Sequence, residues 1–253
     1  MAIQKTPAIV LKTQPFRSSS LIVTFFTRDF GKIRGLAKGV RQEREMRSAL
    51  FELFTHLDIV FYEKTRSDLH LVSEAAMLDS YGGLRTGLEA IAYASYFAEL
   101  VDETTEVHDP NAAIFDILDF AYRYAASIPG SRLARLFEIK LLNEIGWLPY
   151  LEGCLACQKN PLERGFFSFR QGGLLCPECA PSAPDARPLG REPLGVMRYY
   201  VRHDLESCLR LSISSHTEAE LEPFMSGFLL ERLTKPLKTR LFFQKLSPAI
   251  KKF

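Results

Sequence analysis

The sequence predicts an α+β protein of several domains: an N-terminal five-stranded barrel, followed by an all-helical domain into which a cysteine-rich module is inserted. Three observations support this prediction. Short strand-forming segments occupy residues 1–80. From Gly83 onward, apolar residues recur with a helical period. Two Cys-x-x-Cys pairs then interrupt the helical region within residues 151–180.

Five segments near the N-terminus have the composition of β-strands. They are rich in β-branched and aromatic residues, and turn residues separate them. The predicted strands are residues 8–11, 21–27, 32–38, 57–62 and 69–72. A Greek-key barrel of this size is the OB-fold, in which the face of the second and third strands and two connecting loops commonly bind oligonucleotides.

Helical patterns fill most of the remaining chain. Asp109-Pro110-Asn111 is a typical helix start, and Thr217-Glu-Ala-Glu220 has the pattern of a capping box. The predicted helices are residues 84–100, 111–124, 133–145, 194–200, 217–233 and 238–246. Prolines between residues 181 and 193 indicate a linker. The predicted domains are an OB-fold over 1–80, a helical domain over 81–150 and 181–253, and the module over 151–180.

The cysteine pairs carry the strongest chemical signal in the chain. Their spacing, C-x2-C-x18-C-x2-C, suits one zinc ion bound by Cys154, Cys157, Cys176 and Cys179. Four protein ligands leave no open coordination position, so we expect a structural zinc ion. Two disulfides and a redox dithiol are the alternatives. Neither pair has the strand-then-helix setting of a thioredoxin-like dithiol, and Cys208 is predicted to be a buried, inert thiol.

Composition and targeting signals indicate the class of protein. The chain of 253 residues is 47% hydrophobic and 25% charged, as in soluble globular proteins. Its N-terminus lacks the pattern of a signal peptide, and no apolar run has the length of a membrane span. We therefore expect a cytoplasmic protein with reduced thiols and no membrane partner.

Charge is unevenly distributed, although the net charge is only +2. Residues 1–50 hold ten Lys and Arg against three acids, and residues 232–253 hold seven Lys and Arg with no acid. Residues 98–126 hold seven acids and one Arg. Two basic ends around an acidic middle favour an anionic partner, most commonly nucleic acid. A solvated surface is the alternative.

The densest basic segment follows the predicted second strand. Because side chains alternate along a strand, Lys32 and Arg34 share a face. Nearby glycines would allow the chain to follow a phosphate backbone closely. The candidate nucleic-acid contacts are Lys32, Arg34, Lys38, Arg41 and Arg44, with Arg17 of the first connecting loop as a weaker candidate. A flexible, solubilising loop is the alternative.

Aromatic residues near this segment are candidates for base stacking. Phe16 and Phe30 lie in predicted turns, which makes them better candidates than Phe25 and Phe26, although a place in the barrel core is the favoured interpretation of each. Of the latter two, we expect one to point into the barrel and the other outward.

Basic and apolar residues also alternate near the C-terminus. Lys235, Lys238 and Arg240 lie beside Leu237 and an apolar segment at 241–242. Such a mixture suits an acidic peptide that ends in hydrophobic residues. The charged end of a packed helix is the alternative.

Sequence signatures of catalysis are absent. The chain has no P-loop, G-x-S-x-G elbow or H-E-x-x-H motif, and its His-x-Glu does not precede the cysteines as in a zinc deaminase. We therefore expect no catalytic residues and no enzymatic activity. A metal-dependent nuclease would need clustered carboxylates. The candidates are Glu99, Asp102, Glu103, Glu106 and Asp109, and a solvated helix face is the other interpretation of them.

The order of these features resembles the bacterial RecO family of DNA-repair proteins over nearly the whole chain. The resemblance rests on the basic barrel, the stretch Leu36-Ala-Lys-Gly-Val-Arg41 and the cysteine pairs in a helical domain. It also rests on the C-terminal stretches Leu229-Leu-Glu-Arg232 and Lys235-Pro-Leu-Lys-Thr-Arg240.

This resemblance implies a recombination mediator that binds single- and double-stranded DNA and anneals complementary strands. It also implies that the protein helps to load recombinase onto strands coated by single-strand binding protein, with RecR and the C-terminal tail of that protein as partners. A zinc-containing RNA-binding or transcription-associated module is the main alternative, and a protein scaffold is another.

Overall fold

The computed structural model describes residues 2–41, 48–64, 67–160 and 162–240. The chain divides into two compact units. The first consists of Met1–Gly130 with Leu237–Phe253, and the second of Ser131–Pro236. Among the described residues, no helix is both long enough and apolar enough to cross a membrane.

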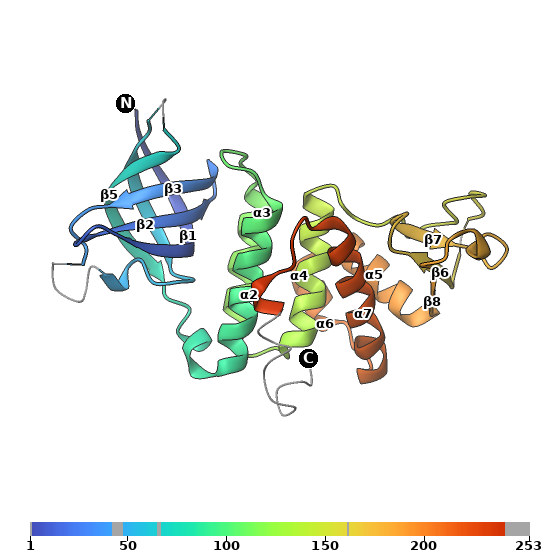
Figure 1. Ribbon diagram of the computed structural model, residues 1–253. Helices are drawn as coiled ribbons and strands as arrows, with labels where there is room; N and C mark the ends of the chain where they lie inside the picture. The colour runs from blue at the N-terminus through green and yellow to red at the C-terminus, as the bar shows by residue number, and fades with distance from the viewer. Residues whose placement is uncertain (1, 42–47, 65–66, 161, 241–253) are drawn as a thin grey trace. The chain divides into compact units, whose positions relative to one another are not determined.

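The strands of the first unit form a closed barrel in the order β1-β2-β3-β5-β4 within the described residues (Figure 1). β3 and β5 pair in parallel, and the other pairs are antiparallel. The strands are β1 (Ile3–Phe16), β2 (Ser20–Thr27), β3 (Gly31–Ala37), β4 (His56–Tyr62) and β5 (Leu69–Asp79). The predicted five-stranded barrel is therefore confirmed. β1 and β5 extend beyond their apolar segments because backbone hydrogen bonds to neighbouring strands do not depend on the side chain.

Alternate residues of each strand fill the barrel interior. Val23, Phe25 and Ile33 have no exposed surface and belong to the barrel core. Phe26 points to the other face of β2, as the alternation predicts, but it is also fully buried. Lys32, its partner on β3, contacts Asp102 of α2 (Leu88–Thr104), and so a helix covers this part of the outer surface.

Helices α2 and α3 (Ala112–Tyr124) complete the first unit, together with the short η1 (Gly82–Thr86) and the segment at 237–240. The side chain of Asn111 accepts a hydrogen bond from the Ile114 N–H at 3.1 Å, which confirms the predicted helix start. The Glu99 carboxylate accepts the Lys238 and Thr239 N–H groups, each at 2.8 Å. It thereby caps a helical turn that begins at Lys238, and residues 241–246 of the predicted helix lie outside the described residues.

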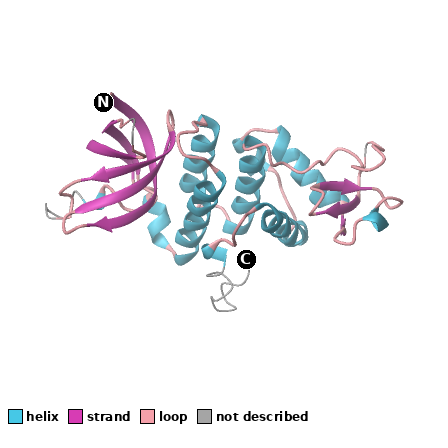
Figure 2. Cartoon of the chain, turned by 45° about the horizontal axis from the view of Figure 1, so that its top comes forward, coloured by secondary structure: helices cyan, strands magenta, loops and turns pink. Residues whose placement is uncertain are grey.

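The second unit contains helices and one small sheet, drawn in cyan and magenta in Figure 2. The sheet has the order β7-β6-β8. The elements are α4 (Gly130–Glu144), which starts at the last residue of the first unit, then β6 (Gly165–Ser168), β7 (Gly173–Leu175), η2 (Ala180–Ser182), β8 (Arg187–Leu189), α5 (Arg191–Arg202), α6 (Leu205–Arg210) and α7 (Ser215–Arg232).

The second unit contains one α-helix that the sequence did not predict, α6, and two further differences from the prediction have a clear physical reason. The proline-rich segment is not only a linker, because β8 pairs with β6. Pro188 is tolerated there because an edge strand can leave one side without N–H donors. α7 is capped by Ser214, whose hydroxyl accepts the Thr217 N–H at 3.1 Å, and not by Thr217. The Thr217 hydroxyl instead donates to Glu192 at 2.7 Å.

Candidate metal centre and nucleic-acid interface

The four predicted cysteine ligands converge in the second unit. Their sulfur atoms all lie within 4.8 Å of one another, and the Sγ atoms of Cys157 and Cys176 are 3.7 Å apart. A tetrahedron with metal–sulfur bonds of about 2.3 Å has edges of about 3.8 Å. Every cysteine of the chain is free of disulfides. The cluster therefore has the geometry to hold one metal ion.

Two tight turns position these sulfurs. The Cys154 carbonyl accepts the Gln158 N–H at 2.9 Å, and the Cys176 carbonyl accepts the Cys179 N–H at 3.0 Å. β7 runs directly into Cys176, and the hairpin before it turns at Gly172, where φ is +75°. A Cβ on Gly172 would lie 2.2 Å from a guanidinium nitrogen of Arg232, but that flexible side chain can move aside, so it is the backbone conformation of this turn that requires glycine.

The surroundings shift the pKa values of two of the thiols in opposite directions. Burial opposes the charge on Cys154, but hydrogen bonds from nearby backbone N–H groups outweigh it and lower the pKa of this thiol to about 6. Contact with the Glu178 carboxylate, followed by burial, raises the pKa of Cys176 to about 12. Four adjacent thiolates would repel one another, so a bound cation is needed to stabilise the fully ionised set.

An arginine of α5 holds the loop that leads to Cys154. The Arg198 guanidinium donates to the carbonyl oxygens of Leu151 at 3.0 Å, Glu152 at 3.1 Å and Leu162 at 2.8 Å. Arg202, one turn further along α5, pairs with the Glu152 carboxylate at 2.8 Å. Sequence reasoning missed both arginines because no local pattern distinguishes them from solvated helix residues.

In the first unit, the structure brings together three of the predicted DNA contacts. The Arg41 N–H donates to the Ser19 carbonyl at 3.0 Å, and its guanidinium donates to the Arg17 carbonyl at 3.3 Å. The Arg17 guanidinium lies 5.3 Å from the centre of the Phe16 ring. Lys38 directly follows β3, and Arg17, Lys38 and Arg41 are all exposed. These cations therefore lie around the turn between β1 and β2.

Arg34 is exposed on the outer face of β3, and a further cation lies in line with it. Arg34 pairs with Thr24 of β2, which pairs with Lys12 of β1. Lys12 is exposed as well. Sequence reasoning missed Lys12, because only the strand register places it beside Arg34.

Lys32 differs from these exposed cations. Its ammonium lies 3.2 Å from the Asp102 carboxylate, and its side chain is only 11% exposed. This ion pair gives Lys32 a role in attaching β3 to α2, and its contact with DNA stays a prediction. Arg44 lies outside the described residues.

The two aromatic stacking candidates have different surroundings. Phe30 is partly buried against the barrel core, with its ring centre 5.4 Å from that of Phe61. Phe16 is half-buried beneath Arg17, beside the exposed cations around the turn between β1 and β2. Phe16 is therefore the better placed of the two for contact with a base.

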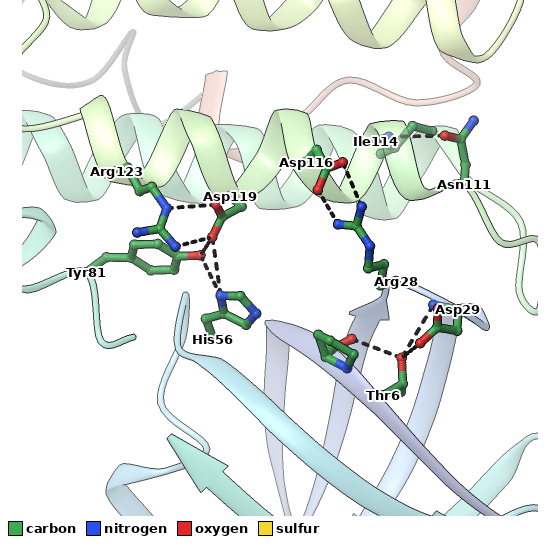
Figure 3. Close-up of polar contacts among 11 residues, drawn as sticks. Thr6, Arg28, Asp29, His56, Tyr81, Asn111, Ile114, Asp116, Asp119 and Arg123 are labelled. Carbon is green, nitrogen blue, oxygen red and sulfur yellow. Dashed lines mark hydrogen bonds and ion pairs between the residues drawn. The ribbon is translucent and has the colours of Figure 1, made fainter. Parts of the chain in front are cut away.

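Two acidic residues of α3 form ion pairs and hydrogen bonds with side chains of the first unit. Figure 3 shows Arg28, at the end of β2, bound to Asp116, with one N–O distance of 3.0 Å. It also shows Asp119 in contact with Tyr81, with His56 at 3.2 Å and with Arg123 at 2.7 Å. Burial opposes the charge on Asp119, but hydrogen bonds from His56, Arg123 and Tyr81 hold the pKa of this carboxyl well below its usual range.

The predicted partner-binding residues divide between the units. Lys235 belongs to the second unit, whereas Lys238 and Arg240 belong to the first. Leu237 beside them is buried, and the Lys238 side chain is exposed. Their role in binding a protein partner stays a prediction.

Comparison with known proteins assigns both parts of the chain to one family. A family model described as recombination protein O N terminal matches residues 1–81, and one described as recombination protein O C terminal matches residues 85–241. The chain is 32% identical over 243 residues to the DNA repair protein RecO of Syntrophus aciditrophicus, covering 94% of each chain. It is 30% identical over 250 residues to that of Anaeromyxobacter dehalogenans, covering 97% of this chain and 98% of the relative. The chain therefore belongs to the RecO family of DNA repair proteins.

Proposed function

We propose that the protein is a recombination mediator that binds single- and double-stranded DNA and anneals complementary strands. It also helps to load recombinase onto strands coated by single-strand binding protein, and it works in the cytoplasm at the nucleoid. One observation carries this proposal: Arg17, Lys38 and Arg41 meet around one turn of the barrel, and Arg34 extends the same basic surface along β3.

The physical requirements of annealing agree with such a surface. Two complementary strands repel each other through their phosphates, and bound cationic side chains displace counterions and reduce that repulsion. Contacts to phosphates carry no base information, so this activity is independent of DNA sequence. It also requires no nucleotide hydrolysis, in agreement with a sequence that has no P-loop.

The acidic residues support a mediator over a nuclease. Glu99 caps the turn at Lys238, and Asp102 binds Lys32, so these two carboxylates are engaged within the protein. A nuclease of the kind considered above would need such carboxylates free to bind Mg²⁺.

We propose zinc as the metal of the cysteine cluster, with a structural role. Thiolate ligands favour Zn²⁺ over Mg²⁺ or Ca²⁺, and four of them leave no position for a reacting water. RecR and the C-terminal tail of single-strand binding protein are the proposed partners. Lys235, Lys238 and Arg240 are the proposed contacts for that acidic tail.

Annealing of two complementary labelled oligonucleotides, one coated with single-strand binding protein, tests the DNA function. The wild type should accelerate annealing, and Lys38→Glu/Arg41→Glu should abolish the acceleration. Arg170→Glu/Arg187→Glu is a control with the same change in net charge, because both side chains are exposed in the second unit. No acceleration by the wild type, or equal loss in both variants, would contradict the proposal. An excess of RNA as competitor separates DNA binding from the RNA-binding alternative.

A further inference from the structure

A cavity of about 390 Å³ lies in the first unit, at the end of β2 opposite to the turn between β1 and β2. Three chain segments form its wall: the turn between β2 and β3, the loop between β4 and β5, and the segment that follows α2. The wall includes the carboxylates of Asp29, Glu63 and Asp68 and the imidazoles of His70 and His108. We call this hollow the acidic cavity.

The three carboxylates of the acidic cavity are not neutralised by ion pairs. Asp29 and Glu63 each accept one hydrogen bond from a neutral side chain of β1, at 2.7 and 3.1 Å. In the part of the chain that the structure describes, no ion pair joins Asp29, Glu63 or Asp68 to a cation. Lys64 also lines the cavity, so its wall holds three carboxylates and one ammonium group. Such an excess of negative charge attracts a cationic ligand.

His70 gives the wall a hydrogen-bond donor that has no acceptor. Its Nδ1 accepts the Lys64 N–H at 3.2 Å, so the neutral ring carries its proton on Nε2. Burial, followed by the proximity of His108, lowers the pKa of His70, which keeps this ring neutral at neutral pH. The residue is only 1% exposed, and Nε2 has no hydrogen-bond partner among the described residues.

This protonation state decides which ligands His70 can serve. A ring nitrogen that carries a proton has no lone pair to offer, so the Nε2 atom of His70 is not a metal ligand. A buried donor without an acceptor is unfavourable, and each such group in a folded protein calls for an explanation. An oxygen acceptor on a bound molecule would satisfy it.

The backbone holds His108 beside His70. The His108 N–H donates to the Lys32 carbonyl of β3 at 3.0 Å, and Val107 forms a β-bridge with Lys32. The φ of His108 is +61°, a conformation that residues other than glycine seldom adopt and that clusters at functional sites. The centres of the two imidazole rings are 5.1 Å apart, with His108 exposed and His70 buried. The wall of the acidic cavity is therefore fixed before a ligand binds.

We infer that the acidic cavity receives a basic side chain of a protein partner, while a peptide carbonyl of that partner accepts the His70 Nε2–H. The carboxylates select a cation, and a guanidinium group suits them best because it donates in pairs to carboxylate oxygens. The unsatisfied donor selects a ligand that also carries an oxygen acceptor. A polyamine has no such oxygen, and the phosphates of nucleic acid would be repelled by the carboxylates. A peptide segment with an arginine has both required groups.

The test is an NMR titration of the full chain that follows the ring resonances of His70 and His108, assigned with His70→Gln and His108→Gln. The probe is arginine capped as its N-acetyl and N-methylamide derivative. Capped citrulline has the same shape without the charge, and agmatine has the guanidinium without the peptide carbonyl. We expect capped arginine to shift both rings, capped citrulline to bind about tenfold more weakly and agmatine about fivefold more weakly. These comparisons use the wild type, so they do not depend on a variant that has to fold.

A double variant tests the part played by the carboxylates. Glu63→Gln/Asp68→Asn should weaken the binding of capped arginine about tenfold. Glu74→Gln/Glu231→Gln is the control with the same change in net charge, because both side chains are exposed and lie outside the cavity wall. It should leave the affinity unchanged.

Several outcomes would overturn the inference. They are equal binding of capped arginine and capped citrulline, no shift of either ring with any probe, and an equal effect of the two double variants. Displacement of capped arginine from His70 by a short oligonucleotide would assign the cavity to nucleic acid instead. The annealing test of the proposed function is independent of these results.

Discussion

Lys32 and Asp102 form an ion pair at 3.2 Å between β3 and α2, with side chains only 11% and 29% exposed. Two residues further along β3, Arg34 is exposed on the same face of the strand. The two cations are equivalent in the sequence pattern, yet only Arg34 has an exposed side chain. Because only Lys32 is held in an ion pair, we expect removal of its charge and removal of the Arg34 charge to affect stability and DNA binding differently.

Lys32→Gln should lower the free energy of unfolding by about 2 kcal/mol, because it leaves a partly buried Asp102 without its partner. We expect the ion pair with Asp102 to outweigh the predicted contact of Lys32 with DNA, so DNA affinity should change less than about twofold. Arg34→Gln should show the converse, with stability unchanged within about 0.5 kcal/mol and weaker binding of DNA. Urea denaturation and fluorescence anisotropy measure the two quantities. Loss of affinity at unchanged stability in Lys32→Gln would show that this lysine contacts DNA.

Replacement of a metal ligand should destabilise the second unit severely. Structural zinc contributes an apparent 10–16 kcal/mol in small zinc-finger peptides, on the order of a whole domain's stability. Cys154→Ser should therefore lose the metal and lower the melting temperature. Cys208→Ser is the control, since Cys208 is buried outside the cluster and should leave about one zinc ion per chain. Elemental analysis with thermal unfolding decides between the outcomes, and an unchanged melting temperature in Cys154→Ser would argue against a metal at this site.

Asp119 should stabilise the first unit in a pH-dependent way. Its folded pKa lies below the unfolded value of about 3.9, so its stabilisation is present at neutral pH and is lost as pH falls through the acid range. Asp119→Asn should cost about 2 kcal/mol at pH 7 and progressively less below about pH 4. Denaturant titrations at several pH values measure this difference. Asp116→Asn is the control: its carboxylate is 53% exposed beside Arg28, and we expect a cost below about 1 kcal/mol. A cost for Asp119→Asn that does not depend on pH would contradict the assigned ionisation.

The affinity for single strands should depend steeply on salt. If Lys12, Arg17, Arg34, Lys38 and Arg41 together neutralise about five phosphates, log affinity should fall with log salt at a slope near −3.5. Lys12→Gln should reduce the magnitude of that slope by about 0.7. Binding measured between 50 and 300 mM salt, roughly the range in which counterion release dominates, gives both slopes. A slope near zero for the wild type would exclude phosphate contacts as the source of affinity.

Local sequence predicted most of the elements and the cysteine cluster. Strand-forming segments separated by turns predicted the barrel, because β-branched and aromatic residues suit a pleated, half-buried surface. The spacing of Cys154, Cys157, Cys176 and Cys179 predicted a cluster that the structure brings within 4.8 Å. Strand-forming composition and cysteine spacing are properties of residues that are close along the chain, so the sequence alone is sufficient to identify them.

Tertiary structure decided which charged side chains stay exposed on the barrel surface and which are paired within the protein. Lys32 and Asp102 are 70 residues apart, and only the packing of α2 on the barrel shows that they pair. Lys12 joins Arg34 only through the register of separate strands. A sequence pattern shows the periodicity of one helix or strand. Contacts between residues of different elements depend on packing and strand register, which the pattern does not contain. The barrel and the cysteine centre could therefore be predicted from the sequence, but the composition of the outer barrel surface required the fold.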